Sequence, residues 1–595
     1  MGLYGWFGKT LRLDLSTGSI KEEAIEKNLL VTWLGGRGLG AHTIFQEVPP
    51  KCDPLGDDNK LVFACGPLTG TDFPGSGRFT VSAKSPLTGT IFDANAGGTW
   101  GVRLKGCGYD RLIIEGKANA PVFLAIKDGK VSLEEAGDLW GKDTSETTES
   151  LTGRFGKDAS VACIGRAGEN QVRFATIIYD GHRALGRGGL GAVMGAKKLK
   201  AILVSGKQKT AVADPGKMEL VVYEANKWVK ANPITSKGLP EFGTPVLVKL
   251  IDELGVLPVR NFNASQFSGI DNISGETIAD NMYVDHSGCE GCPVQCTGMI
   301  TIDPGTTAGP EYEALWALGP ECDIDNLAVI AEANTLCHRF GLDAISAGVT
   351  IGCAMELAER SLLKTDLKFG DIVGLLETIK QIANREDLGA LLAGGSRRFA
   401  ERMGFPQYSM QVKGLELPAY DPRGLQGMGL AFATSNRGAC HFSAYMVGPE
   451  ALGVPKMTDR FATAGKAGLT ITQQNINAAT DSLSICHYMN LALSEEYYAR
   501  ALAAATGLVY QARDLHYAGE RIWNLERLYN LRAGIDPSYD TLPLRLLEEP
   551  VESGPSMGRT VALKPMLAEY YRFRGWDETG IPTPKKLQEL ELGEY

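Results

Sequence analysis

Several features that define other protein classes are missing from this sequence. Lys and Arg number 60 against 70 Asp and Glu, a formal net charge of −10, whereas proteins that bind nucleic acid need an excess of basic residues. Every apolar stretch meets a charge or a glycine before the roughly 18 residues of a membrane span. The start, Met1-Gly2-Leu3-Tyr4-Gly5-Trp6, has neither the basic region nor the apolar run of a signal peptide. We therefore expect a cytoplasmic protein that binds neither nucleic acid nor a membrane.

The composition is that of a large globular protein. The 595 residues are 44% apolar and 22% charged, enough to build roughly two to four packed domains. Glycine, at 72 residues, exceeds its usual share of about 7%. Twelve cysteines in a reducing compartment serve metals or catalysis more often than disulfides.

The pattern of apolar residues changes from strand-like to helix-like near residue 210. Leu11, Leu13 and Leu15 alternate with polar residues before a Ser-Thr-Gly turn, which indicates a hairpin. Asp214 and Pro215 are typical of the cap and first position of a helix, here running to about residue 230. Further strands are predicted at 61–64, 79–83, 112–115, 122–126, 131–133, 161–164, 174–179 and 201–204. Further helices are predicted near 325–340, 343–363, 370–385, 387–403 and 505–530.

These patterns predict an α+β protein. We expect a β-rich domain at residues 1–210, followed by a mostly helical part at residues 211–595.

The strongest chemical signal is a run of cysteines, Cys289-x2-Cys292-x3-Cys296. Three thiolates at this spacing, with Gly291 and Pro293 bending the chain, can hold three corners of a four-iron cluster. A zinc site completed by His286 is an alternative, but no second Cys/His pair of similar spacing follows. Radical enzymes that use S-adenosylmethionine typically have the reverse spacing. An iron–sulfur cluster whose fourth ligand lies elsewhere in the chain is the favoured interpretation.

Glycine-rich loops supply possible anion sites. Gly186-x-Gly188-x-x-Gly191 matches the dinucleotide fingerprint in letters, but it lacks the immediate tight turn and the later acidic residue. Its backbone amides, with Arg183 and Arg187, suit a pyrophosphate-like anion instead. Arg78, beside a Pro-Gly-Ser-Gly stretch, and Asn95, before Gly97, form two similar corners. Solvated arginines at ordinary turns would explain each loop equally well. The stretch at 36–41 resembles the one at 186–192. Two related halves of the β-rich domain would explain this likeness, and so would chance.

Two acidic turns resemble each other. Asp343 follows a helix-stop glycine and can cap the next helix. Asp481 is predicted to lie in a similar capping turn, with Cys486 five residues later. A carboxylate can accept paired hydrogen bonds from the N–H edge of a pterin, as it does from guanidinium. Either Asp alone is equally explained as a helix cap.

Together these motifs resemble the aldehyde ferredoxin oxidoreductase family of tungsten enzymes over nearly the whole chain. The matching segments are 258–262, the cysteine run, 309–313, 341–346, 435–441, 481–486 and 574–577. The resemblance implies two pterins whose dithiolenes hold one tungsten or molybdenum, with Mg²⁺ bridging the pterin phosphates. It also implies that the helical part forms two domains, at residues 211–417 and 418–595, with the cofactor buried at the junction of the three domains. A [4Fe-4S] cluster is implied as well.

The resemblance assigns roles to individual residues. Glu313 and His441 match the family's catalytic pair, with Glu311 left open as the alternative to Glu313. Cys486 matches the fourth cluster ligand, and His487 beside it would tune the cluster or cover it. The expected contacts to pterin and magnesium are Arg78, Asn95, Gly97, Arg183, Ala184, Gly186, Arg187, Asp343 and Asp481.

The implied reaction is oxidation of an aldehyde to a carboxylic acid. His441 would polarise the carbonyl, and Glu313 would act as general base on the attacking water. Electrons would leave through the cluster to ferredoxin or an iron–sulfur partner subunit. Some family members bind an iron between subunits through an E-x-x-H sequence, which this chain lacks, so a homo- or hetero-oligomer stays open.

Two other functions are weighed against this one. A thiolate from Cys322 near the metal would favour a catalytic subunit of the benzoyl-CoA-reductase type, whereas a small buried thiol is the ordinary interpretation. A non-catalytic iron–sulfur electron-transfer protein would leave the glycine loops and acidic turns unexplained.

Overall fold

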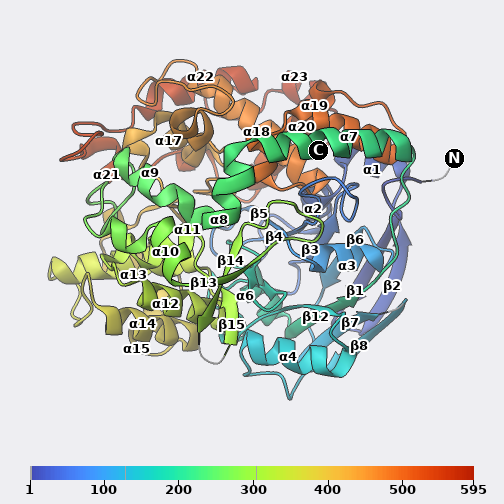
Figure 1. The fold of residues 1–595 in the computed structure, drawn as a ribbon, viewed down its shortest axis with the longest axis horizontal. Helices are drawn as coiled ribbons and strands as arrows, with labels where there is room; N and C mark the ends of the chain where they lie inside the picture. The colour runs from blue at the N-terminus through green and yellow to red at the C-terminus, as the bar shows by residue number, and fades with distance from the viewer. Residues whose placement is uncertain (1–2, 128, 303–304) are drawn as a thin grey trace.

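The computed structural model describes residues 3–127, 129–302 and 305–595 (Figure 1). Two six-stranded sheets make up the N-terminal part. The first has the order β2-β1-β6-β3-β4-β5 and the second β11-β10-β9-β12-β7-β8. Within each sheet one neighbouring pair, β1 with β6 and β7 with β12, is parallel and the other pairs are antiparallel.

The strands of the first sheet are β1 Lys9–Asp14, β2 Ser19–Ala24, β3 Leu61–Cys65, β4 Phe79–Lys84, β5 Ile91–Ala96 and β6 Arg111–Glu115. Those of the second are β7 Val122–Lys127, β8 Lys130–Glu135, β9 Ser160–Cys163, β10 Ile178–Tyr179, β11 Arg183–Ala184 and β12 Leu199–Ser205. The longer helices among them are α1 Lys27–Trp33, α2 Gly36–Glu47, α3 Trp100–Gly106, α4 Thr144–Phe155 and α6 Leu190–Ala196.

Most predicted strands are confirmed, with one clear exception. The segment predicted as a strand over 174–179 pairs only at Ile178–Tyr179. Ala175 instead forms an isolated bridge with Leu342, in the helical part of the chain. The first residues of the segment 174–179 thus contact the helical part of the chain instead of lengthening strand β10.

The rest of the chain is mostly helical, as predicted. Its longer helices are α7 Pro215–Ala231, α10 Gly275–Asn281, α11 Tyr312–Leu318, α12 Leu327–Phe340, α13 Ala344–Glu359, α14 Ile372–Asn384, α16 Ser396–Met403, α17 Gln426–Thr434, α18 Lys466–Leu483, α19 Glu495–Thr506, α20 Ala512–Arg532 and α22 Leu563–Arg574. Shorter ones include α15 Asp387–Leu392, α21 Leu544–Glu548 and α23 Pro584–Glu589. The helix predicted over 387–403 is split into α15 and α16, because Gly394 and Gly395 interrupt it and Gly395 has φ of +85°.

A small third sheet carries the cysteine run. Its strands are β13 Tyr283–Ser287, β14 Thr297–Ile302 and β15 Gly305–Ala308, paired antiparallel in that order. The three cysteines occupy the connection between β13 and β14. They therefore lie on a loop held at both ends by ladder hydrogen bonds.

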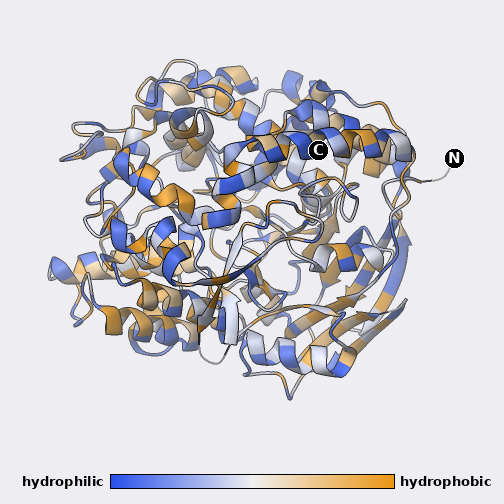
Figure 2. Cartoon of the chain, in the orientation of Figure 1, coloured by the Kyte–Doolittle hydropathy of each residue, from blue (hydrophilic) through white to orange (hydrophobic). Residues whose placement is uncertain are grey.

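Apolar burial explains how these parts are held together. The buried residues of α7, Met218, Val221, Ala225 and Val229, follow helical spacing, and Figure 2 shows both hydrophobic and hydrophilic residues along this helix. The largest core includes both Trp316 and Trp523, from opposite sides of residue 417. The division at 210 and 417 stays a prediction.

Among the described residues, the helices are too short or too polar to cross a bilayer.

Candidate active site

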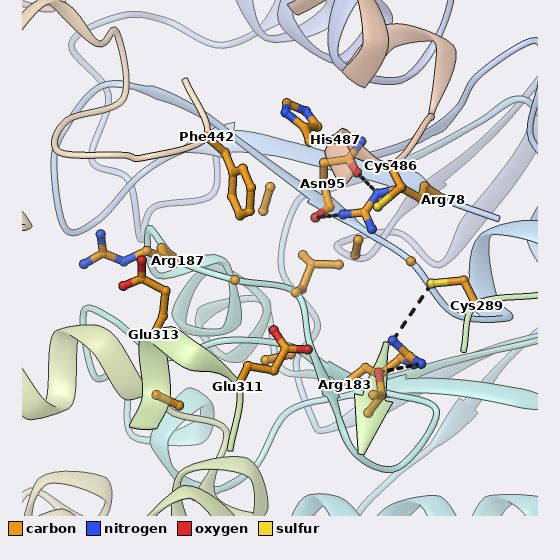
Figure 3. A pocket seen from close by; sticks show the side chains of 18 of the residues that line it. Arg78, Asn95, Arg183, Arg187, Cys289, Glu311, Glu313, Phe442, Cys486 and His487 are labelled. Atoms are coloured by element: carbon orange, nitrogen blue, oxygen red, sulfur yellow. Dashed lines mark hydrogen bonds between the residues drawn. The ribbon is translucent and has the colours of Figure 1, made fainter. Parts of the chain in front are cut away.

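One large cavity lies where the N-terminal sheets meet the helical part (Figure 3). It offers about 320 Å³ to the centres of water molecules, against roughly 10–15 Å³ for one bound water. Every predicted site residue lines it. From the N-terminal part these are Arg78, Asn95, Gly97, Arg183, Ala184, Gly186 and Arg187; from the helical part they are Cys289, Cys292, Cys296, Glu313, Asp343, His441, Asp481 and Cys486.

The β4–β5 hairpin presents Arg78 and Asn95. Arg78 directly precedes β4, and Asn95 lies on β5 opposite Thr80. Arg78 donates from Nε to Asn95 Oδ1 and from Nη2 to the Asn95 carbonyl at 3.0 Å, and Asn95 Nδ2 donates to Thr80 Oγ1 at 3.1 Å. The pair is thus fixed before any ligand arrives.

The second glycine loop presents Arg183, Ala184, Gly186 and Arg187. It follows the edge strand β11, which pairs only antiparallel with β10, so the geometry differs from a dinucleotide-binding turn. Arg183 Nη2 donates to Thr297 Oγ1 at 3.3 Å. Gly186 has φ of +89°, which a residue with a side chain adopts only under strain.

Two buried arginines from the N-terminal part each reach one of the predicted pterin aspartates. Arg187 Nε donates to Asp343 Oδ2 at 3.0 Å, and Arg37 Nη1 donates to Asp481 Oδ2 at 3.4 Å. These are the arginines of the two similar glycine stretches noted in the sequence. Each stretch thus brings one arginine to one of the two aspartates, and only the 186–192 stretch also lines the cavity.

The two acidic turns are less alike than their sequences suggested. Asp343 caps α13, accepting from the backbone of Ile345 at 3.1 Å, as predicted. The expectation that Asp481 caps a following helix is wrong, because it lies inside the last turn of α18. Ser484, with φ of +61°, ends that helix after Asp481 rather than before it.

Charge partners keep Asp481 ionised. Burial by itself raises the pKa of Asp481, but His487 and Arg37 outweigh it and lower the pKa to about 2. His487 Nε2 lies 2.7 Å from Asp481 Oδ1. His487 therefore contacts the acidic turn directly.

The four predicted cluster thiols surround one end of the cavity. Burial, with Cys486 close by, raises the pKa of the Cys292 thiol to about 11, and burial also raises the pKa of Cys486. Metal binding would release these protons. Within the described residues, groups of three His, Cys, Asp or Glu close enough to hold a single ion do not occur, so the thiols stand further apart than the ligands of one zinc ion.

Cys322 and His286 lie outside the cavity lining. The Cys322 thiol is fully buried and donates to the carbonyls of Ala317, at 3.5 Å, and Gly348, at 3.7 Å. This is the ordinary buried thiol that the sequence allowed, and it gives the cavity no sulfur ligand. His286 instead packs its ring against Tyr283, with ring centres 5.4 Å apart.

The predicted catalytic pair is close but not bonded. Glu313, on α11, accepts from the backbone of Ala419 at 3.0 Å through Oε2, whereas its Oε1 faces His441 Nε2 at 3.7 Å. Burial raises the pKa of Glu313 to about 8, and burial together with Arg187 lowers the pKa of His441 well below its usual value. Both groups are therefore uncharged at neutral pH, and the contact is not an ion pair.

Sequence reasoning missed part of the lining. Arg437 lies in the 435–441 motif, and its Nη1 donates to Asp93 Oδ2 at 2.8 Å. Asp93 also lies 3.4 Å from Arg37, and this charge network was not predictable from local sequence. Other cavity residues without a predicted role are Phe442, Tyr488, His182, His338 and Asn334.

The lining fits a large anionic group. Four guanidinium groups, Arg78, Arg183, Arg187 and Arg437, line one cavity, and arginine forks match phosphate oxygens. Several buried polar atoms that line it lack a partner in the described chain, and buried polar atoms ordinarily have one. They are His182 Nε2, Glu313 Oε1, Asn334 Nδ2, His338 Nδ1, Arg437 Nε, His441 Nδ1 and His487 Nδ1.

A cavity of this size, lined by arginines and by four thiols, is what a redox enzyme that buries a large cofactor would present. The family model described as "Aldehyde ferredoxin oxidoreductase, domains 2 & 3" matches residues 220–592 of this chain. The model of the N-terminal domain of the same family matches residues 10–206. The chain belongs to the aldehyde ferredoxin oxidoreductase family.

Named relatives agree with this assignment. The chain is 46% identical, over all of both chains, to the tungsten-containing aldehyde ferredoxin oxidoreductases of Pyrococcus furiosus and Thermococcus kodakarensis. It is 29% identical to the WOR-like subunit of an aliphatic sulfonate oxidoreductase of Pyrococcus furiosus, covering 98% of that chain. Among solved structures, the active-site complex BamBC of benzoyl coenzyme A reductase has a TM-score of 0.88 at 25% identity, covering 100% of this chain and 98% of that one.

Proposed function

We propose that this protein oxidises aldehydes to carboxylic acids with a tungsten–pterin cofactor and passes the electrons to ferredoxin or an iron–sulfur partner. The observation that carries the proposal is that the Glu313–His441 pair and the four thiols line the same cavity. An aldehyde bound beside the pair would therefore react within the same enclosure as the redox groups. When bound, the tungsten–pterin group accepts the two electrons that the aldehyde loses.

The reaction needs water as the second substrate. Aldehyde and water give a carboxylate, three protons and two electrons, so a base must remove protons beside the carbonyl carbon. Ionised Glu313 is placed to take the proton of the attacking water. A neutral His441 still has one N–H, which can donate to the carbonyl oxygen as negative charge develops there.

Arginines and aspartates would hold the cofactor. Arg78, Arg183 and Arg187 would bind its phosphates, with Mg²⁺ beside Asn95 and Ala184, and Asp343 and Asp481 would accept from the pterin N–H groups. Gly97 and Gly186 would let the backbone approach closely.

A [4Fe-4S] cluster would take its four ligands from Cys289, Cys292, Cys296 and Cys486. The cysteine loop reaches the surface, since Glu290, Gly291 and Pro293 are exposed. Electrons would therefore leave towards ferredoxin on this side of the molecule.

The test is metal analysis and turnover of protein purified without oxygen. We expect about one tungsten, four iron and two pterins per chain, by the composition proposed above, and reduction of a viologen by aliphatic or aromatic aldehydes. Protein that holds tungsten and pterin but oxidises none of a broad aldehyde panel would overturn the proposal.

A benzoyl-CoA-reductase-like reaction on an aromatic thioester is the second candidate, because the similar solved structure is such an enzyme. The position of Cys322, buried away from the cavity, argues against it. A non-catalytic electron carrier would have no use for so large a cavity.

A further inference from the structure

A second, smaller cavity adjoins the first on the outer side of Phe442. It offers about 50 Å³ to the centres of water molecules, room for roughly four waters at 10–15 Å³ each. Its lining reaches the surface at Pro455, which is exposed, while Phe442, His487 and Tyr488 line both cavities. The two spaces therefore meet at these three side chains.

Phe442 stands at this meeting point, directly beside the catalytic histidine. Its ring centre lies 4.2 Å from that of His441 and 5.5 Å from that of His487. On the outer side it stacks at 26° on Tyr445, with ring centres 6.0 Å apart. Figure 3 shows the ring on the opposite side of the cavity from Glu311.

The backbone of Phe442 is held from the smaller cavity. Asn477 Nδ2 donates to the Phe442 carbonyl at 3.0 Å, and Asn490 Oδ1 accepts from Tyr498 at 2.6 Å. Both amides are thus engaged by the protein. Phe442, Tyr445, Val454 and Leu491 offer a guest apolar surface, beside the polar side chains of Gln473 and His487.

We propose that this outer cavity is the subsite for the side chain of the aldehyde, and that Phe442 sets the size of side chain admitted. The inference rests on the proposed function, because the carbonyl must lie beside Glu313 and His441. Burial of apolar surface gives each carbon placed there a favourable contribution. The substrate class is aldehydes with an unbranched apolar side chain of a few carbons, and bicyclic aromatic aldehydes are excluded.

The test compares size selectivity in the holoenzyme. Removing the ring in Phe442→Ala enlarges the space where the two cavities meet, so kcat/KM for 2-naphthaldehyde relative to butanal should rise by about tenfold or more, the scale at which pockets discriminate apolar groups. Val454→Trp fills the subsite and should lower kcat/KM for butanal by about tenfold while changing acetaldehyde little, since its methyl group does not reach Val454. Phe461→Ala, in a ring outside both cavities, is the matched control and should leave the ratios unchanged.

A binding measurement makes the result independent of turnover. Calorimetry should show that Phe442→Ala binds 2-naphthoate about tenfold more tightly than wild type, with acetate unaffected. If Phe442→Ala is recovered without tungsten, Phe442→Leu replaces it, with the same expected direction.

The subsite proposal would be overturned if Phe442→Ala and Val454→Trp both kept the wild-type ratios of kcat/KM between large and small aldehydes and the wild-type affinity for 2-naphthoate. Aldehyde oxidation as the proposed function would still stand. Tungsten-loaded wild type that oxidises no aldehyde would overturn the proposed function. In that case altered carboxylate binding would still support the subsite, and unaltered binding would reject it.

Discussion

Glu313 Oε1 lies 3.7 Å from His441 Nε2, and within the described chain neither Glu313 Oε1 nor His441 Nδ1 has a hydrogen-bond partner. That separation is too long for a hydrogen bond. Unpartnered buried polar atoms are costly in a folded protein, so their presence here marks a place prepared for a ligand. A carbonyl group and a water molecule would meet in the cavity beside this pair, because 3.7 Å leaves no room for either between the two atoms.

Removing the carboxylate of Glu313 should stop the reaction without emptying the site. Loss of a general base ordinarily costs about 100- to 10,000-fold in rate, so we expect Glu313→Gln to lower kcat by that factor. Tungsten and pterin contents, measured by mass spectrometry and by fluorescence after oxidation, should equal those of wild type.

Glu311→Gln is the matched control for this experiment. Glu311 lines the same cavity, and its side chain makes no capping bond to α11, so it should keep most activity. The assignment fails if Glu311→Gln is inactive and Glu313→Gln turns over at a near-normal rate.

The pH dependence of the reaction should report the buried carboxyl. Because burial raises the pKa of Glu313 to about 8, most of it is protonated at pH 7 and unable to act as a base. Ionisation increases with pH, so kcat/KM should rise between about pH 6 and 9 and level off above. A profile that falls over this range, or one with the same rise in Glu313→Gln, would contradict the role.

Cys486→Ser should remove the iron–sulfur cluster. Cys486 lies far in sequence from the other three thiols but lines the same end of the cavity, and a serine oxygen is a poor substitute for thiolate on iron. We expect loss of most iron and sulfide and of the reduced-cluster EPR signal. Cys322→Ser, whose hydroxyl can keep the bonds to Ala317 and Gly348, should retain both iron and tungsten; equal losses in the two variants would contradict the assignment.

Gly97→Ala should disturb the same cluster by crowding alone. A Cβ at Gly97 would overlap Cys289 Sγ, so the cysteine loop would have to move. We expect a lowered iron content with tungsten less affected. Gly153→Ala, in α4 with open space around it, should be neutral or stabilise by up to about 1 kcal/mol in thermal unfolding. Normal iron in Gly97→Ala would show that the loop accommodates the methyl group.

Helix starts, hairpins and helix caps depend on interactions between residues close in sequence, so local patterns could predict them. The helix capped by Asp214, the hairpin of β1 and β2 and the cap at Asp343 follow from short-range spacing and are all present. The prediction for Asp481 failed because its backbone continues α18. Gly341 ends a helix before Asp343, whereas no such glycine precedes Asp481, and that local difference marks which of the two aspartates is a cap.

The site itself needed the family resemblance. No periodicity brings Cys486 to the loop of Cys289, or His441 to Glu313, because such contacts depend on how distant elements pack. Arg37 and Asp93 show the limit clearly. Both are buried in one charge network with Glu526, 489 residues from Arg37. The glycine stretch that contains Arg37 gives no sign of these partners, and Asp93 lies in no predicted motif.

The pairing of Arg37 with Asp481 and of Arg187 with Asp343 has a consequence for biosynthesis. The walls of the cavity come from positions as far apart as Gly75 and Met489, so a nascent chain has no complete pocket until most of it has left the ribosome. Once both ion pairs form, each one connects the N-terminal part of the chain to the helical part. The cavity is therefore complete only when the N-terminal and helical parts have folded onto each other and both ion pairs have formed.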